Sequence, residues 1–464
     1  MSTVSTPAQA ARRELTGFGG RLIGPDDAEY DEARSVHNAM IDKRPALIAR
    51  PATPDEVARV VAFARDNDLL LAIRGGGHNG AGLGTADDGV VIDLSLLKDI
   101  EVDPHARTVR AGGGCTWGEV DSATNEHGLA TPSGIVSTTG VGGLTLGGGI
   151  GHLSRKHGLA IDNLLEADVV LASGERVRAS ADENPDLFWA LRGGGGNFGV
   201  VTSFLFRLHE VGTVIGGPTF WPAELGAEVL SAYREFLPTA PRELNGFFAF
   251  TVVPPAPPFP EAIHLRNVCA VVWCYIGDEA GAAKAMAPLL EKLPEPLLHG
   301  VGAMPHSALQ GAFDGLYPPG DQWYWRADFV EKIPDEAIAI HARFGAALPT
   351  MKSTMHLYPI DGAVHDVQSG DTAWGYRNAT WGSVFAGVDP DPANAELVSR
   401  WSIDYFEALH PYSAGGGYVN MMMDEGQDRV RAAYGGNYDR LARIKATYDP
   451  ENLFRVNQNV RPAA

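Results

Sequence analysis

The sequence of 464 residues is poor in cysteine and has no long apolar run. Its three cysteines, Cys115, Cys269 and Cys274, are too few for a disulfide framework and lack the spacing of a zinc site. No segment approaches the roughly 18 consecutive apolar residues that a membrane-spanning helix needs. The paired Arg12 and Arg13 near the N-terminus are not followed by an apolar segment, so we expect no secretory leader. We therefore expect a cytoplasmic protein with reduced thiols, without a metal site and without a membrane partner.

Positive charge is also scarce. The chain has 37 Lys and Arg against 57 Asp and Glu, which gives a net charge of −20. Nucleic acids and anionic membranes are bound through clustered Lys and Arg, so we expect no nucleic-acid partner. What the chain has in excess is glycine, with 55 residues gathered in a few short runs rather than in a repeat. An anionic ligand would have to be held by backbone N–H groups instead of a basic surface.

The first part of the chain predicts short strands that alternate with helices. The segment Ala46–Arg50 reads as a strand, and the helix after it is capped by Thr53, with Glu56 completing a capping box. The second strand, Leu69–Ile73, runs directly into a glycine-rich loop. The segment after that loop, Gly89–Leu94, is again a strand and not a helix.

Beyond about residue 212 the glycine-dense pattern ends. Predicted strands at 245–253, 268–275 and 324–330 are mixed with a predicted helix at 279–293. This order is typical of an antiparallel sheet with helices on one face. A further strand is predicted over residues 417–423. The whole pattern favours an α+β fold.

Four glycine clusters lie at residues 75–84, 112–114, 140–151 and 193–199. Glycine lets the backbone turn tightly and bring its N–H groups close to a ligand. Several such loops in one domain indicate a long, phosphate-bearing ligand that is held mainly by main chain. The dinucleotide fingerprint of a Rossmann fold needs a strand, then G-x-G-x-x-G, then a helix. The helix is missing here, so the Rossmann interpretation fails.

The loop Arg74-Gly-Gly-Gly-His78-Asn-Gly resembles the flavinylation loop of the vanillyl-alcohol-oxidase superfamily. The likeness continues in order through residues 140–163, 197–201 and 448–459. More narrowly, the chain resembles the berberine-bridge-enzyme-like oxidoreductases, near the nicotine-oxidase type. The resemblance implies FAD as cofactor and a two-part FAD-binding domain of the PCMH type. A substrate domain, built on an antiparallel sheet with helices on one face, would be inserted into it.

The resemblance also gives expected domain boundaries. The FAD-binding domain is expected over residues 1–212, with its core at 42–212. The substrate-binding domain is expected over 213–416, and the segment 417–464 is expected to return to the FAD-binding domain.

In the family, the histidine of this loop bonds to the 8α-methyl group of the flavin, and the resemblance assigns that role to His78. Imidazole suits the task because it is a neutral nucleophile near neutral pH. Many relatives add a second bond from a cysteine, but here Val136 occupies the matching position. Since a valine forms no thioether, we expect a single covalent link. Cys115 lies well upstream and is interpreted as a small buried residue.

Further FAD contacts are implied by the resemblance, in the glycine loops and near the C-terminus. They are Arg74, Gly75, Gly76, Gly77, Asn79, Gly80, Thr139, Gly140, Gly142, Gly143, Thr145, Gly148, Gly149, Gly151, His152, Asn197, Gly199, Val200, Val201, Asn420, Asn457 and Asn459. Amide side chains such as Asn457 both donate and accept, which suits the pyrimidine edge of a flavin. Thr139 falls where relatives control oxygen access, and its size, close to that of valine, should admit O2.

Two residues are candidates for the catalytic base. On the predicted strand 417–423, Tyr418 and Asn420 would project from one face, and the resemblance turns this face towards the flavin. Asp366 matches an acidic base that the family carries on a strand of the substrate domain. On such a strand His365 would point the opposite way, so only one of the two could reach the pocket, and His365 is the alternative.

The expected activity is FAD-dependent oxidation of a C–OH or C–N group of a small molecule, with O2 as electron acceptor and H2O2 as product. This corresponds to an oxidase of the alcohol or the amine class. The alternative is an oxidative or non-redox cyclisation of a natural-product scaffold, which some members of the family carry out. A third hypothesis is a binding module with a structural flavin, which the retained Tyr418, Asn420 and Asn457 argue against. The sequence leaves the substrate and the oligomeric state open.

Overall fold

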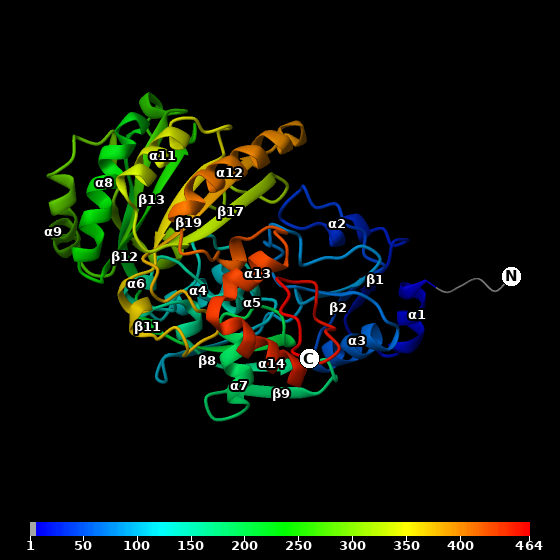
Figure 1. Ribbon diagram of the computed structural model, residues 1–464. Coiled ribbons are helices and arrows are strands. Elements are labelled where there is room, and N and C mark those ends of the chain that lie inside the picture. Colours follow the sequence, from blue (N-terminus) through cyan, green and yellow to red (C-terminus); the bar gives the residue numbers. More distant parts are fainter. Residues whose placement is uncertain (1–5) are drawn as a thin grey trace.

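The N-terminal part of the computed structural model, which describes residues 6–464, contains a four-stranded sheet in the order β1-β2-β4-β3 (Figure 1). Its strands are β1 (Arg21–Ile23), β2 (Leu47–Arg50), β3 (Leu71–Arg74) and β4 (Val90–Asp93). Its helices are α1 (Pro7–Glu14), α2 (Tyr30–Arg34) and α3 (Pro54–Asp66). Strands β2 and β3 both pair in parallel with β4, and α3 forms the crossover between them. The strand predicted after the first glycine loop is therefore confirmed.

Helix α3 begins where the sequence predicts. The Thr53 hydroxyl accepts a hydrogen bond from the N–H of Glu56, and Pro54 occupies the first turn. The predicted capping box is only half formed, because the Glu56 carboxylate does not accept a hydrogen bond from the backbone N–H of Thr53. The Glu56 carboxylate accepts from the N–H of Ala52 at 2.8 Å and from that of Gly20 at 3.2 Å. It thereby fastens the segment before β1 to the start of α3.

The second sheet is antiparallel and has the order β5-β6-β10-β8-β9. Its strands are β5 (Ile100–Asp103), β6 (Thr108–Gly112), β8 (Leu164–Val170), β9 (Arg176–Ser180) and β10 (Val200–Arg207). The helices around it are α4 (Trp117–Asn125), α5 (Val141–Leu146), α6 (Ser154–His157), α7 (Pro185–Leu191) and the 3-10 turn η1 (Ala160–Asp162). Strands β7 (Leu129–Ala130) and β11 (His209–Glu210) form a separate antiparallel pair. Its core is built from Phe204 and Phe206 of β10, packed with Trp117 and Leu187.

The third and largest sheet has the order β15-β12-β14-β13-β18-β19-β17, with β16 also pairing β12, and all of its pairs are antiparallel. Its strands are β12 (Thr213–Pro222), β13 (Leu244–Val252), β14 (Asn267–Tyr275), β15 (Leu298–His299), β16 (Gly302–Pro305), β17 (Gln322–Val330), β18 (Thr354–Pro359) and β19 (Trp381–Asp389). Helices α8 (Gly226–Phe236), α9 (Glu279–Leu290), α11 (Asp335–Gly345) and α12 (Ala395–Leu409) cover one face, as Figure 1 shows. The short helix α10 (His306–Gln310) packs against α4. The predicted antiparallel sheet with helices on one face is confirmed.

The two faces of this sheet bury different clusters, because successive side chains of a strand point to opposite sides. On β13, Phe248 and Phe250 pack with the helices. Their neighbours Phe247 and Ala249 belong to the cluster on the other face, which also contains Tyr418 of the C-terminal segment. The second face is therefore turned towards the rest of the chain.

The C-terminal segment differs from its prediction at one place. The strand predicted over 417–423 is wrong, since Val419–Met421 forms a 3-10 turn, η8. Helices α13 (Gln427–Tyr434) and α14 (Tyr438–Tyr448) follow. After α14 the chain runs back beside the glycine loop at 193–199, where the Asn197 amide donates to Gln458 O at 3.1 Å and accepts from Val460 N–H at 2.9 Å.

The large sheet suggests where the chain divides. Strand β12 begins at Thr213, and α12, which packs on the sheet, ends at Leu409. We propose on this basis the divisions at 212/213 and 416/417. Over residues 6–464, no helix combines the length and the apolar character needed to cross a membrane.

Candidate active site

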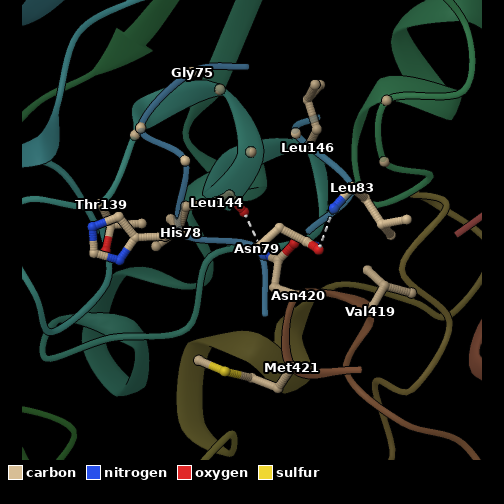
Figure 2. A pocket seen from close by; sticks show the side chains of 18 of the residues that line it. Gly75, His78, Asn79, Leu83, Thr139, Leu144, Leu146, Val419, Asn420 and Met421 are labelled. Carbon is tan, nitrogen blue, oxygen red and sulfur yellow. Dashed lines mark hydrogen bonds between the residues drawn. The ribbon is translucent and has the colours of Figure 1, made fainter. Parts of the chain in front are cut away.

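A cavity of about 330 Å³ lies between the glycine loops and the second face of the large sheet. Figure 2 shows His78 and Thr139 together on one side of this pocket, with Asn420 and Met421 entering from the C-terminal segment. The predicted residues that line it are Arg74, Gly75, Gly76, Gly77, His78, Asn79, Thr139, Gly140, Gly142, Gly143, Asn197, Gly199, Val201, Tyr418, Asn420 and Asn457. Loops far apart in the sequence are thus brought to one site.

Other predicted contacts lie behind the cavity wall. They are Gly80, Thr145, Gly148, Gly149, Gly151, His152, Val200 and Asn459, none of which is among the lining residues in the described part of the chain. A methyl group at Gly151 would collide with the carbonyl oxygen of Ser133, so a glycine is needed here for the two loops to pack closely. His152 is buried against Phe247, and Val200 belongs to the core of the N-terminal sheet.

Asp366 does not reach the cavity. It lies in a 3-10 helix, Gly362–Asp366, and not on the predicted strand. Its carboxylate pairs with Arg242 at 2.6 Å with 57% of the side chain exposed, and that guanidinium lowers the pKa of Asp366. The alternative, His365, is also engaged, with Nε2 2.8 Å from the carbonyl oxygen of Ala379. Gly362 adopts a φ of +66°, which turns the backbone at the point where the sequence suggested a strand.

Tyr418 and Asn420 meet at the cavity although no strand carries them. The Tyr418 hydroxyl oxygen accepts a hydrogen bond from the N–H of Gly149 and another from Nδ2 of Asn420, both at 2.9 Å. Asn420 also donates to Leu144 O at 3.0 Å, drawn as a dashed line in Figure 2. Burial raises the pKa of Tyr418, and the two N–H donors oppose that rise because they stabilise the phenolate.

The sheet contributes lining residues that the sequence prediction missed. His356 and Tyr358 of β18 lie two positions apart and share the cavity face, with Nδ1 of His356 2.6 Å from the Tyr358 hydroxyl. Burial lowers the pKa of His356 to about 3, so its imidazole is neutral. Strand β17 adds Trp323 and Trp325, whose rings meet edge to face with centroids 5.6 Å apart. Polar and apolar side chains alternate over residues 354–359, and this alternation was the sequence signal that could have predicted a strand with His356 and Tyr358 on one face.

The cavity lining is electrically neutral apart from one paired cation. Arg74 donates to Asp93 at 2.9 Å, and Arg50 reaches the same carboxylate at 2.7 Å. Among residues 6–464, no Asp, Glu or Lys lines the cavity. Within the same range, no group of three or more His, Cys, Asp or Glu is arranged to hold a metal ion.

His78 is held in a defined position at one side of the cavity. Gly77 adopts a φ of +71°, a left-handed conformation that favours glycine and turns the chain into His78. Nε2 of His78 lies 3.0 Å from the hydroxyl oxygen of Thr138, and the His37 ring stacks on the His78 ring at a centroid distance of 4.1 Å. Burial, and secondarily His37, lower the pKa of His78 to about 3.

Comparison with known proteins identifies this arrangement. A family model described as an FAD binding domain matches residues 45–180, and one described as berberine and berberine like matches residues 417–461. An FAD-linked oxidoreductase of Dictyostelium discoideum is 32% identical over 432 residues, which cover 92% of this chain and 90% of the relative. The chain belongs to the berberine-bridge-enzyme-like FAD-linked oxidoreductases.

Solved structures agree with this assignment. The 6-hydroxy-D-nicotine oxidase of Arthrobacter nicotinovorans superposes with a TM-score of 0.84 at 28% identity, covering 96% of this chain and 98% of that one. The xylooligosaccharide oxidase of Myceliophthora thermophila gives a TM-score of 0.86 at 25% identity, covering 98% and 100%. The predicted α+β fold of the PCMH type is confirmed, and this berberine-bridge-enzyme-like protein is an FAD-linked oxidoreductase.

The cavity fits FAD on two observations. Gly143 and Gly196 line it, and a methyl group at either position would meet no protein atom within 4 Å, so the space beside these backbones is open to a ligand. Asn457 donates to Gly196 O at 3.1 Å, while its buried Oδ1 has no partner in the described part of the chain and calls for a donor from a ligand. Since Arg74 is already paired, the pyrophosphate charge has to be met by backbone N–H groups.

Proposed function

We propose that the protein is an oxidase that removes hydride from a C–OH group of an uncharged, ring-bearing small molecule. FAD held at this site would supply the hydride acceptor, with O2 as the final electron acceptor and H2O2 as the product. The observation that carries the proposal is the Tyr418 hydroxyl, which sits at the cavity and accepts two N–H hydrogen bonds.

Tyr418 is the proposed base. A phenolate forms most easily where donors face its oxygen, and Gly149 N–H and Asn420 Nδ2 supply two of them. Tyr418 acts in its ionised form, so that the phenolate oxygen takes the proton of a substrate hydroxyl as the C–H bond is broken. Asn420 is in turn held by Leu144 O, which keeps its amide directed at the phenol.

The substrate class follows from the wall opposite the glycine loops. This wall consists of aromatic and aliphatic side chains, namely Phe313, Tyr317, Trp323, Trp325, Val384 and Ala386. An ammonium group would find no carboxylate there, and burying an unpaired charge is costly. The His356–Tyr358 pair offers hydrogen bonds without charge. These features favour a neutral alcohol over a protonated amine, although relatives include a nicotine oxidase and a xylooligosaccharide oxidase.

We further propose one covalent link to FAD, through His78. Val136 lines the cavity where relatives carry a second, cysteinyl link, and its side chain offers no sulfur. Thr139, also a lining residue, is small enough to leave a path for O2. Both features support a singly linked flavin that reacts with oxygen.

The proposal is tested by anaerobic mixing with matched panels of neutral aryl alcohols, amines and short oligosaccharides. A substrate should bleach the flavin band near ~450 nm, and readmitted air should release one H2O2 per flavin reduced. Tyr418→Phe should slow bleaching by about 100-fold, the usual size of a general-base contribution. A product isomeric with its substrate, formed without bleaching, would instead support cyclisation, and bleaching by amines alone would refute the alcohol assignment.

A further inference from the structure

The chain immediately before Tyr418 has no side chains that could hold it in place. Gly415, Gly416 and Gly417 follow one another there, and Gly415 adopts a φ of +87°. Glycine backbones are the least restricted of all residues, so three in a row fix no conformation by themselves. The place of the Tyr418 phenol therefore depends on contacts that other residues make with this glycine segment, residues 414–417.

One set of contacts comes from β17, the strand at the end of the large sheet. Phe329 uses both of its backbone groups. Its N–H donates to Gly416 O at 2.9 Å, and its carbonyl oxygen accepts from Ala414 N–H at 2.7 Å. The glycine segment thus lies along the edge of the sheet. Among residues 6–464, no backbone N–H reaches the carbonyl oxygen of Gly415, which lies between these two bonds.

Arg429 of α13 supplies the missing donor. Its Nη1 donates to Gly415 O at 3.2 Å, while Nη2 donates to Ala327 O at 2.7 Å and to the Asp328 carboxylate at 2.6 Å. One planar guanidinium therefore joins the glycine segment to two neighbouring residues of β17. Gly417 permits this close approach, because a methyl group there would come within 2.7 Å of Nη2.

The guanidinium is itself held from several sides. Only 11% of the Arg429 side chain is exposed, and its charge lies over the Phe406 ring of α12, 5.2 Å from the centroid. Its Nε faces the Glu425 carboxylate at 3.5 Å. Asp328 is held in turn by Nδ1 of His410 at 2.9 Å. Arg429 therefore meets the glycine segment in a single geometry.

We propose that Arg429 is a positioning residue, which fastens the glycine segment to the substrate sheet and thereby fixes the Tyr418 phenol between the two walls of the cavity. The inference rests on the role of Tyr418 under the proposed function. It adds which residue keeps that base in place. The phenol oxygen keeps its hydrogen bond from Gly149 N–H, on a glycine loop of the opposite wall, only while the segment that carries it stays fixed.

Loosening the segment should alter the chemistry in a defined way. The N–H groups of Gly149 and Asn420 lower the pKa of Tyr418 against the rise that burial causes, because they stabilise the phenolate. A phenol that moves away from these donors ionises at a higher pH. The neighbouring Tyr358 does not obscure this change, because burial raises its own pKa and keeps it neutral. The pH midpoint of flavin reduction should therefore rise by about one unit.

Arg429→Lys tests the role on the flavin-loaded protein. Lysine keeps the charge beside Asp328 but has one nitrogen in place of the two that reach Gly415 O and Ala327 O separately. We expect anaerobic flavin reduction to be about tenfold slower, with the raised pH midpoint. The FAD content and the substrate concentration for half-maximal rate should not change. A wild-type rate and pH midpoint would show that Arg429 only balances charge, and would overturn the inference.

The matched control is Arg431→Gln on the same helix. The Arg431 side chain is 62% exposed and pairs with Asp439, not with the glycine segment. This variant should reduce its flavin at the wild-type rate. A defect equal to that of Arg429→Lys would trace the effect to α13 in general and refute the specific role.

Hydrogen exchange gives a readout that does not depend on turnover. In Arg429→Lys the amides of residues 414–421 should exchange about tenfold faster, while α13 keeps its protection. If the lysine variant fails to fold, the double variant Arg429→Gln with Asp328→Asn removes both charges of the buried pair and should show the same changes. Wild-type exchange and reduction in that variant also refute the role.

Tyr418→Phe separates this inference from the proposed function. Reduction at the wild-type rate in Tyr418→Phe refutes the base itself. Slow reduction in Tyr418→Phe together with wild-type behaviour in Arg429→Lys refutes only the positioning role.

Discussion

The two walls of the cavity are built in opposite ways. The glycine-loop wall presents mainly backbone, with side chains such as His78 and Asn457 at a few points. The sheet wall presents side chains, with Trp323 and Trp325 on β17 and His356 and Tyr358 on β18. Backbone contacts suit a ligand that is the same in all relatives. Alternating side chains on a rigid sheet suit a ligand that differs from one relative to the next. This contrast supports the proposal that cofactor and substrate are recognised by separate parts of the chain.

The largest effect is expected on the loop wall, at the proposed attachment point. His78→Ala removes the imidazole, so covalent FAD should fall from one per chain to none, and acid should release all of the flavin. Absorbance of the acid supernatant, together with the intact mass of the protein, measures this. Cys115→Ala is the control: Cys115 is fully buried and outside the cavity lining, so the variant should keep its covalent flavin. Loss of attachment in the control would contradict the single link.

Substitutions of two glycines on the loop wall, Gly76 and Gly143, distinguish a role in backbone packing from a role in ligand contact. A methyl group at Gly76 would collide with the backbone nitrogen of Gly140, so Gly76→Ala should lower the free energy of unfolding by about 2 kcal/mol. Gly143 has open space around it and lies within helix α5, so Gly143→Ala should leave the fold stable while lowering the flavin content. Denaturant unfolding and flavin-to-protein ratios distinguish the two. Equal stability of the Gly76→Ala variant and wild type would contradict the close approach.

The sheet wall should respond to pH instead. Burial lowers the pKa of His356 to about 3, whereas an unfolded histidine titrates near about 6.5. Between these two pKa values the unfolded state binds a proton that the folded state does not bind, so the free energy of unfolding falls as the pH drops. His356 alone should remove about 2 kcal/mol from the free energy of unfolding between pH 7 and pH 5.

His356→Phe should abolish that part of the pH dependence, measured by urea unfolding at both pH values. The quantity compared is the change in unfolding free energy between pH 7 and pH 5, and not its value at either pH. The variant also leaves Tyr358 without its hydrogen-bond partner, which lowers stability at both pH values. His127→Phe, at an exposed position, is the matched control and should keep the wild-type slope. An unchanged slope in His356→Phe would show that the imidazole takes up a proton as readily in the folded state as in the unfolded state, contrary to its lowered pKa.

The same contrast explains what sequence reasoning achieved. The loop wall was predictable because its residues form contiguous motifs, so His78, Gly140 and Asn457 were placed at the cavity by the resemblance alone. The sheet wall was not, because its lining is spread over β17, β18 and β19, whose order in space follows from pairing that no local pattern specifies.

The errors in the prediction have local causes. Tyr418 and Asn420 meet through a 3-10 turn, so the face of a strand that the sequence suggested is not what brings them together. The choice of Asp366 relied on a strand, whereas Gly362 turns the backbone and Arg242 draws the carboxylate to the surface. Residues such as His152 lie next to ligand-lining loops in sequence but face the protein interior, a distinction that depends on tertiary packing.

The contacts of Asn197 have a consequence for synthesis of the chain. The segment after α14 supplies Asn457 and Gln458 to the cavity and is tied to the loop at Asn197, far back in the sequence. A nascent polypeptide that has emerged only as far as the large sheet therefore offers FAD a half-built pocket. Capture of the coenzyme becomes a late event, completed once translation has delivered that closing stretch.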